Sequence, residues 1–246
     1  MKVAVIGAAG RMGTAICSAI ENTEDMHLVA RLDAADPITV DTLAGAQVAV
    51  EFTVPQATQA NVHAVLAAGC HVVVGTTGWT EQSLAEVREH CQRVGKNAII
   101  APNYSISAVL SMIFARKAAP FFESVEVIEL HHPDKADAPS GTAMTSAQMI
   151  AHARRDAGCA VSPDRTQSDP YGARGADIDG VRVHAVRLRG LYAHQEVLLG
   201  NAGEQLVIRQ DSFDRASFMP GIIAAVRAVS QRSGLTYGLE DVLDIH

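Results

Sequence analysis

The chain has 246 residues, of which 48% are hydrophobic and 19% charged, enough for one large domain or two modest ones with buried cores. Because only 4% are aromatic, these cores should consist mainly of Val, Ile, Leu and Ala, as in α/β proteins. A formal net charge of −7 argues against a nucleic-acid or anionic-membrane partner. It does not exclude local basic pockets for anionic ligands.

The cysteines show no C-x-x-C spacing, and most of them lie in apolar segments: Cys17, Cys70, Cys91 and Cys159. This usage predicts reduced, small buried side chains in a cytoplasmic protein. No apolar run reaches the roughly 18 residues that a membrane span needs. The apolar start is interpreted as a first strand, because Arg11 follows it at once.

A glycine turn follows the first predicted strand, residues 2–6, which reads as a β-rich run buried on both faces. The turn has the spacing G-x-x-G-x-x-G, and apolar residues then recur with helical period. A strand, glycine turn and helix together predict a dinucleotide site, since the backbone can approach a pyrophosphate at the positive helix start. The predicted cofactor contacts here are Gly7, Ala8, Ala9, Gly10, Arg11 and Met12.

Asp33 ends the second predicted strand, residues 27–32. It lies about 20 residues beyond the glycines, where a carboxylate usually accepts hydrogen bonds from the adenosine ribose hydroxyls. Ala34 follows, so no arginine there grips a 2′-phosphate, although Arg11 could do so from the glycine turn. We therefore expect NADH to be used well and NADPH to be tolerated.

Further strands predicted at 47–53, 71–74 and 98–101 alternate with helices. Such repeated β-then-α order predicts a right-handed parallel sheet. Gly75, Thr76 and Thr77 follow one of these strands at its carboxyl end, where open α/β sheets bind ligands. Their small side chains would let a nicotinamide ribose come close.

The alternation stops at about Ser105, which indicates a second, α+β domain. A turn-rich polar stretch within it is expected to form a mobile loop over or beside the site. A strongly apolar helix and a closing segment then return to the first domain. The elements predicted are a helix from 106, a strand at 125–130, a helix at 140–156, the polar stretch 158–180, strands at 181–188, 196–199 and 205–209, the helix 220–229 and the closing segment 238–245.

Two histidines stand at the end of the strand predicted at 125–130, because Pro133 cannot continue its hydrogen-bond ladder. Neighbouring strand residues face opposite sides, so His131 and His132 should not converge on one atom, and no metal is expected. One ring is then left for chemistry and the other for a second role nearby. Lys135 adds a cation to the same stretch.

Ser140 is predicted to be the N-cap of the following helix. Position 143 is Ala, so the usual capping-box Glu or Gln is missing. The first N–H groups, at Gly141 and Thr142, are expected to hold an external anion at the positive end of the helix dipole. A proton donor, a cation and an anion-binding helix start together predict a carboxylate-bearing substrate that is protonated.

With these motifs and the run Ala101-Pro-Asn-Tyr104, the whole chain resembles the 4-hydroxy-tetrahydrodipicolinate reductase (dihydrodipicolinate reductase) family. The most specific part is E-x-H-H-x-x-K-x-D-x-P-S-G-T-A, matched from Glu129 to Ala143. The expected fold is α/β, with a Rossmann-type parallel-sheet domain of residues 1–105 and 213–246. A smaller α+β domain of residues 106–212 would serve substrate binding and tetramerisation.

The resemblance implies NADH- or NADPH-dependent reduction of a cyclic, unsaturated dicarboxylate in lysine and diaminopimelate synthesis. Hydride would come from the nicotinamide and the proton from His131, with Lys135 assisting. A homotetramer is implied as well. The implied cofactor contacts also include Ala101, Pro102, Asn103 and Tyr104, and the implied substrate contacts are His132, Ser140, Gly141 and Thr142.

Two other functions remain open. One is a different two-domain NAD(P)-dependent dehydrogenase, for instance one that acts on an amino acid. The other is a non-catalytic sensor that binds NAD(P) and reports redox state. A sensor needs the glycine turn and Asp33, but it has no use for His131 and Lys135 beside an anion-binding helix start.

Overall fold

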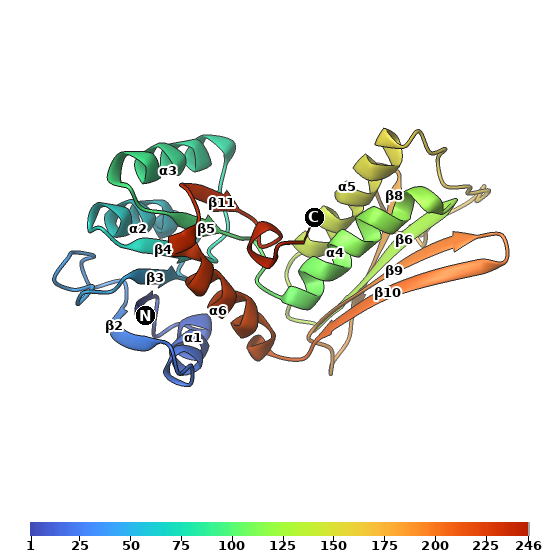
Figure 1. The fold of residues 1–246 in the computed structure, drawn as a ribbon. Coiled ribbons are helices and arrows are strands. Elements are labelled where there is room, and N and C mark those ends of the chain that lie inside the picture. Colours follow the sequence, from blue (N-terminus) through green and yellow to red (C-terminus); the bar gives the residue numbers. More distant parts are fainter. Residues whose placement is uncertain (246) are drawn as a thin grey trace. The chain divides into compact units, whose positions relative to one another are not determined.

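The computed structural model of the chain describes residues 1–245, which fall into two compact units (Figure 1). The first unit comprises Met1–Ile106 together with the residues from Arg215 onward. The second unit is Ser107–Asp214. The sequence had predicted the boundaries after residues 105 and 212. Among the described residues, no helix combines the length and the apolar character that a membrane crossing requires.

The first unit is built on a six-stranded sheet in the order β11-β5-β4-β3-β1-β2, in which every pairing is parallel. This confirms the predicted parallel α/β sheet. Apart from Lys2 and His71, the residues of the central strands β1, β3, β4 and β5 are buried, as expected for runs of Val, Ile and Ala covered on both faces. The strands are β1 (Lys2–Ile6), β2 (His27–Leu32), β3 (Val48–Glu51), β4 (His71–Val74), β5 (Ala98–Ile100) and β11 (Leu235–Tyr237).

Helices cover both faces of this sheet (Figure 1). Helices α2 (Pro55–Ala67) and α3 (Glu81–Val94) pack side by side on one face, and α1 (Arg11–Glu21) and α6 (Met219–Ala228) pack on the other. Strand β11 precedes the closing segment 238–245, which contains the 3-10 turn Asp241–Leu243. Two further 3-10 turns of the first unit flank α6, at Arg215–Phe218 and Val229–Gln231.

The second unit has a five-stranded mixed sheet in the order β10-β9-β6-β8-β7. Its only parallel pair among the described residues is β6 with β8. The helices α4 (Ile106–Ala118) and α5 (Gly141–Asp156) lie on one face of the sheet (Figure 1), with a 3-10 turn at Ala119–Phe121. The strands are β6 (Ser124–His131), β7 (Ala176–Ile178), β8 (Val181–Arg187), β9 (Ala193–Asn201) and β10 (Glu204–Ser212).

Strand β6 alternates strictly between two environments. Val125 and Val127 are buried against α5, in a cluster with Ala147 and Ile150. Because side chains alternate along a strand, Glu129 and His131 share that helix-facing side. Helix α5 therefore determines which side of β6 carries the chemistry.

The polar stretch 158–180, predicted to be a loop, ends in strand β7. Arg174 within it donates hydrogen bonds to Glu126 of β6 and to Asp164. His184 of β8 bonds to the same Glu126 carboxylate at 2.7 Å. Part of the stretch is therefore attached to the sheet, on the side of β6 opposite to α5.

Candidate functional site

The glycine turn between β1 and α1 has no room for side chains at its ends. Gly7 has a φ of 83°, and a Cβ there would lie 2.3 Å from the carbonyl oxygen of Phe52. A Cβ on Gly13 would lie 1.9 Å from the carbonyl oxygen of Gly7. Helix α1 begins after Gly10 with no side-chain cap and no acidic residue in its first turn. Its positive end therefore suits an external anion.

Asp33, at the end of β2, faces this turn. Its Oδ1 accepts a hydrogen bond from the backbone N–H of Ala9 at 3.0 Å. Its own N–H donates to Asp36 Oδ2 at 2.8 Å, so a second carboxylate lies beside the first. Ala8, also in the turn, is buried and donates its N–H to the carbonyl of Leu32. Ribose binding by Asp33 stays a prediction.

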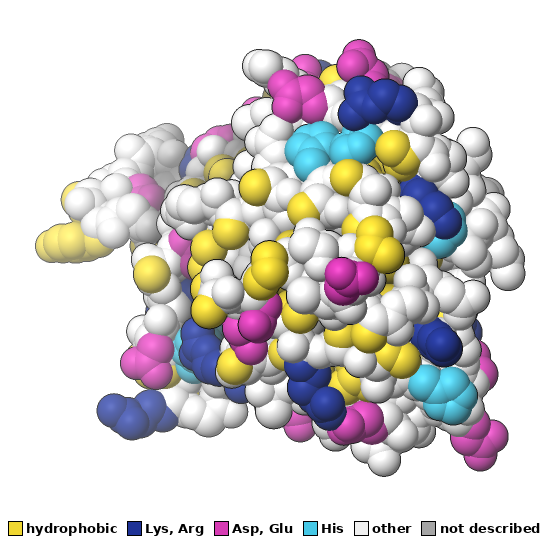
Figure 2. Space-filling model, turned by 90° about the vertical axis from the view of Figure 1, so that its left-hand side faces the viewer, with side chains coloured by type: hydrophobic (Ala, Val, Ile, Leu, Met, Phe, Trp, Pro, Cys, Tyr) yellow, Lys and Arg dark blue, Asp and Glu magenta, His cyan; other side chains and the backbone are white. Residues whose placement is uncertain are grey.

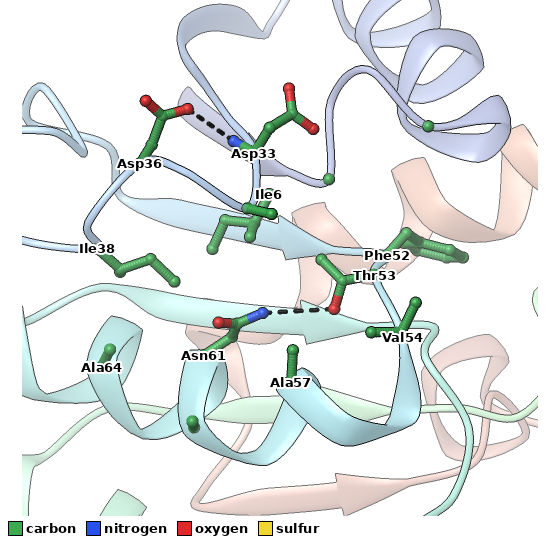
Figure 3. A pocket seen from close by; sticks show the side chains of 14 residues that line it. Ile6, Asp33, Asp36, Ile38, Phe52, Thr53, Val54, Ala57, Asn61 and Ala64 are labelled. Carbon is green, nitrogen blue, oxygen red and sulfur yellow. Dashed lines mark hydrogen bonds between the residues drawn. The ribbon is translucent and has the colours of Figure 1, made fainter.

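A hollow of about 540 Å³, here called the first hollow, opens beside Asp33 (Figure 3). Aliphatic side chains from β1, from the segment after β2 and from α2 line most of it, which suits a flat, uncharged ring. The carboxylates of Asp33 and Asp36 suit hydroxyl donors, and none of the described residues lining it is basic. Its lining comprises Ile6, Gly7, Gly10, Asp33, Ala34, Asp36, Ile38, Phe52, Thr53, Val54, Ala57, Ala60, Asn61 and Ala64.

A second hollow, of about 310 Å³, shares Gly10, Phe52 and Thr53 with the first. It brings Arg11 and Met12 of the glycine turn together with residues that follow β4. Both hollows thus lie along the carboxyl ends of the parallel strands, where such sheets bind dinucleotides. The residues present therefore fit NADH or NADPH. The lining comprises Gly10, Arg11, Met12, Phe52, Thr53, Pro55, Gly75, Thr76 and Thr77.

The run from Ala101 to Tyr104 contacts this region through the buried ring of Tyr104, which lies near Phe52. Tyr104 is 2% exposed, and its hydroxyl donates to the carbonyl of Val74 at 2.8 Å. Its ring lies 5.7 Å from that of Phe52, measured between centroids. Ala101 is buried, Pro102 is exposed, and Asn103 Oδ1 accepts the N–H of Ser105. These four residues line neither hollow, so their cofactor contacts stay predictions.

In the second unit, His131 is bonded to a buried carboxylate. The distance from its Nδ1 to Glu129 Oε2 is 2.5 Å, and Glu129 is fully buried. The two residues are neighbours on one face of β6, so the strand itself brings them together. Glu129 also accepts from both terminal nitrogens of Arg187, at 2.8 and 2.9 Å, and from the N–H of Ser140 at 3.1 Å.

For both residues of this pair, burial and the hydrogen bond between them shift the pKa in opposite directions. Burial lowers the pKa of His131, and the nearby cations Lys135 and Arg187 add to that, whereas the bond to Glu129 opposes it. Burial would raise the pKa of Glu129, but the hydrogen bonds from Arg187 and His131 outweigh it and the pKa is lowered. Glu129 is therefore held as a carboxylate that accepts from the imidazole.

The neighbouring predicted residues have separate partners. The ring of His132 lies 6.2 Å from that of Tyr192 between centroids, apart from the Glu129 cluster that binds His131. Lys135 Nζ donates to Asp137 Oδ1 at 2.7 Å, and this lysine lowers the pKa of Asp137. The two histidines thus face different surroundings, as strand alternation predicts.

Ser140 is the N-cap of α5, as predicted, and its hydroxyl accepts the N–H of Ala143 at 3.1 Å. The first turn carries no acidic residue. Gly141 is exposed, and a Cβ built on it would meet no atom within 4 Å. There is therefore open space for a ligand beside the first backbone N–H of the helix. The substrate contacts of Gly141 and Thr142 stay predictions.

Several residues of these sites were not assigned from the sequence. Phe52, Asp36 and Asn61 line the first hollow, and Arg187 donates two hydrogen bonds to Glu129. Asn61 also donates to Thr53 across the hollow (Figure 3). Arg187 carries no local signal, because its role depends on the pairing of two distant strands. Asp36 was detectable as a second acid three positions after Asp33.

Known proteins resemble the chain along its whole length. The family model described as "Dihydrodipicolinate reductase, N-terminus" matches residues 1–104, and "Dihydrodipicolinate reductase, C-terminus" matches residues 107–243. A 4-hydroxy-tetrahydrodipicolinate reductase of Beutenbergia cavernae is 56% identical, covering 100% of this chain and 99% of the relative. One of Corynebacterium efficiens is 52% identical, with the same coverage.

Solved structures also resemble the chain over nearly its whole length. A dipicolinate-bound dihydrodipicolinate reductase from Paenisporosarcina sp. TG-14 has a TM-score of 0.87 at 35% identity, covering 98% of both chains. A probable dehydrogenase from Thermotoga maritima has a TM-score of 0.62 at 11% identity, covering 98% of this chain and 92% of its own. The second likeness concerns the fold alone.

Proposed function

The chain belongs to the dihydrodipicolinate reductase family, and we propose that it converts 4-hydroxy-tetrahydrodipicolinate to tetrahydrodipicolinate: the hydroxyl group leaves as water, and the resulting dihydrodipicolinate is reduced with NADH or NADPH. This is a step of lysine and diaminopimelate synthesis. The observation that carries the proposal is the segment from β6 to α5, which combines a carboxylate-bound histidine, a lysine and a helix start with no acidic residue in its first turn. A sensor of NAD(P) has no use for this combination.

The cofactor is held by the first unit. The glycine turn lets the pyrophosphate come close, the first backbone N–H groups of α1, at Arg11 and Met12, bind it, and Asp33 accepts from the adenosine ribose hydroxyls. Gly75, Thr76 and Thr77 border the nicotinamide side. The run Ala101–Tyr104 completes that side in this proposal. When bound, the nicotinamide supplies a hydride.

The substrate is held and protonated by the second unit. The protonated ring of His131 gives its Nε2 proton to the carbon next to the one that receives the hydride. The ring is left neutral, with Nδ1–H still donated to Glu129. Lys135 stabilises negative charge on the substrate, and His132 with the N–H groups of Gly141 and Thr142 holds its carboxylates.

We also propose a cytoplasmic homotetramer. Free cysteines, three of them buried, support a reducing compartment. The face of the second sheet opposite to α5 carries the half-buried apolar residues Ile128, Leu130 and Leu198, which an assembly through this sheet would cover. Light scattering after size-exclusion chromatography measures the subunit number. A monomer at micromolar concentration would refute this assembly.

The reaction is tested by following nucleotide absorbance while the dipicolinate precursor is generated in situ, with NADH and NADPH in parallel. We expect oxidation that depends on the precursor. Absence of oxidation by protein that demonstrably binds NADH would instead favour another dehydrogenase or a sensor. A melting temperature raised by 2,6-pyridinedicarboxylate in the presence of NADH would support the substrate class independently of turnover.

A further inference from the structure

Four hydrogen-bond donors converge on the carboxylate of Glu129, a residue with no solvent exposure. Arg187 supplies two of them, at 2.8 and 2.9 Å. His131 Nδ1 lies 2.5 Å from one oxygen, and the N–H of Ser140 lies 3.1 Å from the other. A buried carboxylate is costly unless it is paired and fully hydrogen-bonded, and here it is both.

The strand register explains this convergence. In the parallel pairing of β6 with β8, His131 lies opposite Arg187 and Glu129 lies opposite Ala185. Arg187 therefore projects from the neighbouring strand at the level of the imidazole and reaches the carboxylate two residues back. It also donates to the carbonyl of Asp137 at 2.7 Å, which ties the segment between β6 and α5 to β8.

We propose that Glu129 and Arg187 are positioning residues, which keep the His131 proton on Nδ1 and so present Nε2 to the substrate. The same carboxylate fixes Ser140, hence the start of α5, relative to the imidazole. This inference rests on the proposed function, because it assigns Nε2 as the nitrogen that gives the proton. Neither residue touches the substrate in this scheme.

A carboxylate that accepts from one imidazole nitrogen determines the tautomer and the ring orientation together. If Glu129 and Arg187 served only to hold the segment between β6 and α5 in place, they would not control the charge on His131. The charged groups around His131 are Glu129, Arg187 and Lys135. Glu129 is the only one of these three that favours the protonated ring, so removing its charge should lower the pKa of His131.

The decisive measurement is the pH dependence of kcat/KM, which reports the essential groups of the free enzyme. The alkaline limb marks loss of the His131 proton. Glu129→Gln removes the charge that raises the pKa of His131, while burial, Lys135 and Arg187 still lower it. We expect the limb to move to lower pH, on the order of one unit, and kcat to fall about 10-fold or more, because the ring loses the carboxylate that orients it.

The chain offers a matched control on the same strand. Glu126 lies on the opposite face of β6 and also accepts from an arginine and a histidine, Arg174 and His184. Glu126→Gln removes the same charge from β6 and should leave the limb in place. Arg187→Gln removes a cation that lowers the pKa of His131, so its limb should move to higher pH. An unmoved limb in both the Glu129 and Arg187 variants would overturn the inference.

A second measurement needs neither turnover nor a folded variant of Glu129. Nitrogen-15 spectra of the histidine rings in the wild-type protein distinguish a bare nitrogen from a protonated one, and His131→Gln assigns the signals. We expect neutral His131 to carry its proton on Nδ1. A proton on Nε2 would refute the positioning role whatever reaction the enzyme performs. If wild-type protein showed the expected tautomer but no reductase activity, only the proposed function would fail.

Discussion

The carboxylate of Asp33 accepts the backbone N–H of Ala9 at 3.0 Å, which joins the end of β2 to the glycine turn. A negative charge is thereby held at the edge of the first hollow, with Asp36 beside it. Such a charge attracts ribose hydroxyls as donors and repels a 2′-phosphate. Cofactor preference should therefore be encoded at this edge.

Asp33→Ala should weaken NADH binding about 10-fold or more, because charge-assisted hydrogen bonds of the order of 1.5–3 kcal/mol are lost. Fluorescence titration with NADH measures the dissociation constant. Asp41→Ala, at an exposed position outside both hollows, is the control. Unchanged NADH affinity in the Asp33 variant would show the assignment to be wrong.

Ala34→Arg should improve the use of NADPH. Ala34 lines the first hollow, so a guanidinium there can pair with the 2′-phosphate in a bidentate manner. We expect the ratio of kcat/KM for NADPH to that for NADH to rise about 10-fold, as for a gain of roughly 1.4 kcal/mol. Ala35→Arg adds the same charge one residue away, outside the lining. An equal change in both variants would mean that general charge, not this position, governs the preference.

His131→Ala should lower kcat by about 10²- to 10⁴-fold, the usual contribution of a general acid. NADH affinity should stay unchanged, since the hollows that fit the cofactor belong to the first unit. Steady-state kinetics and NADH titration measure the two effects separately. His152→Ala, on the exposed side of α5, controls for loss of a histidine. Losses of similar size in turnover and in NADH binding would argue against the general-acid role.

Lys135→Ala should lower kcat and also raise KM for the substrate, because one cation both stabilises developing charge and binds a carboxylate. The side chain is 21% exposed and paired with Asp137, so it is held near the start of α5. Lys96→Ala, in the first unit, removes an equal charge and should leave both constants unchanged. If the Lys135→Ala variant had the kcat of the wild-type protein, Lys135 would have no part in the mechanism.

The stability of the first unit should depend on pH through a histidine pair. His63 on α2 and His90 on α3 are joined between their Nδ1 atoms at 2.7 Å, so one nitrogen must lack a proton. Burial lowers the pKa of His90, and Arg93 and His63 add to this. Because the folded pKa lies below the unfolded value of about 6.5, this contribution is present above that pH and is lost as the pH falls below it.

His90→Gln should therefore flatten the pH dependence of the melting temperature between about pH 7.5 and 5. At the upper end the variant should be less stable by about 1 kcal/mol, the size of one hydrogen bond. Differential scanning calorimetry measures both effects. The exposed His27, changed to Gln, is the control. Parallel profiles for wild-type protein and the His90 variant would contradict the expectation.

Local patterns were sufficient for elements whose signal lies within a few neighbouring residues. The strand before the glycine turn, the alternation on β6 and the Ser140 cap were predicted from such patterns and are confirmed. Strand β11 was missed, because three residues are too few to show a period and β5 supplies its hydrogen bonds. Strand β7 was missed inside the polar stretch for the same reason.

Sequence patterns were enough to predict which functional groups are present: a glycine turn of dinucleotide type, an acid after β2, and a histidine and lysine before a capped helix. These are short-range features, since backbone propensity and side-chain alternation act over a few residues. Which of these charged groups contact one another depends on the pairing of strands that are distant in the chain. Arg187 lies 58 positions from Glu129 in the chain, and only the parallel pairing of β6 with β8 brings the guanidinium to the carboxylate that holds His131.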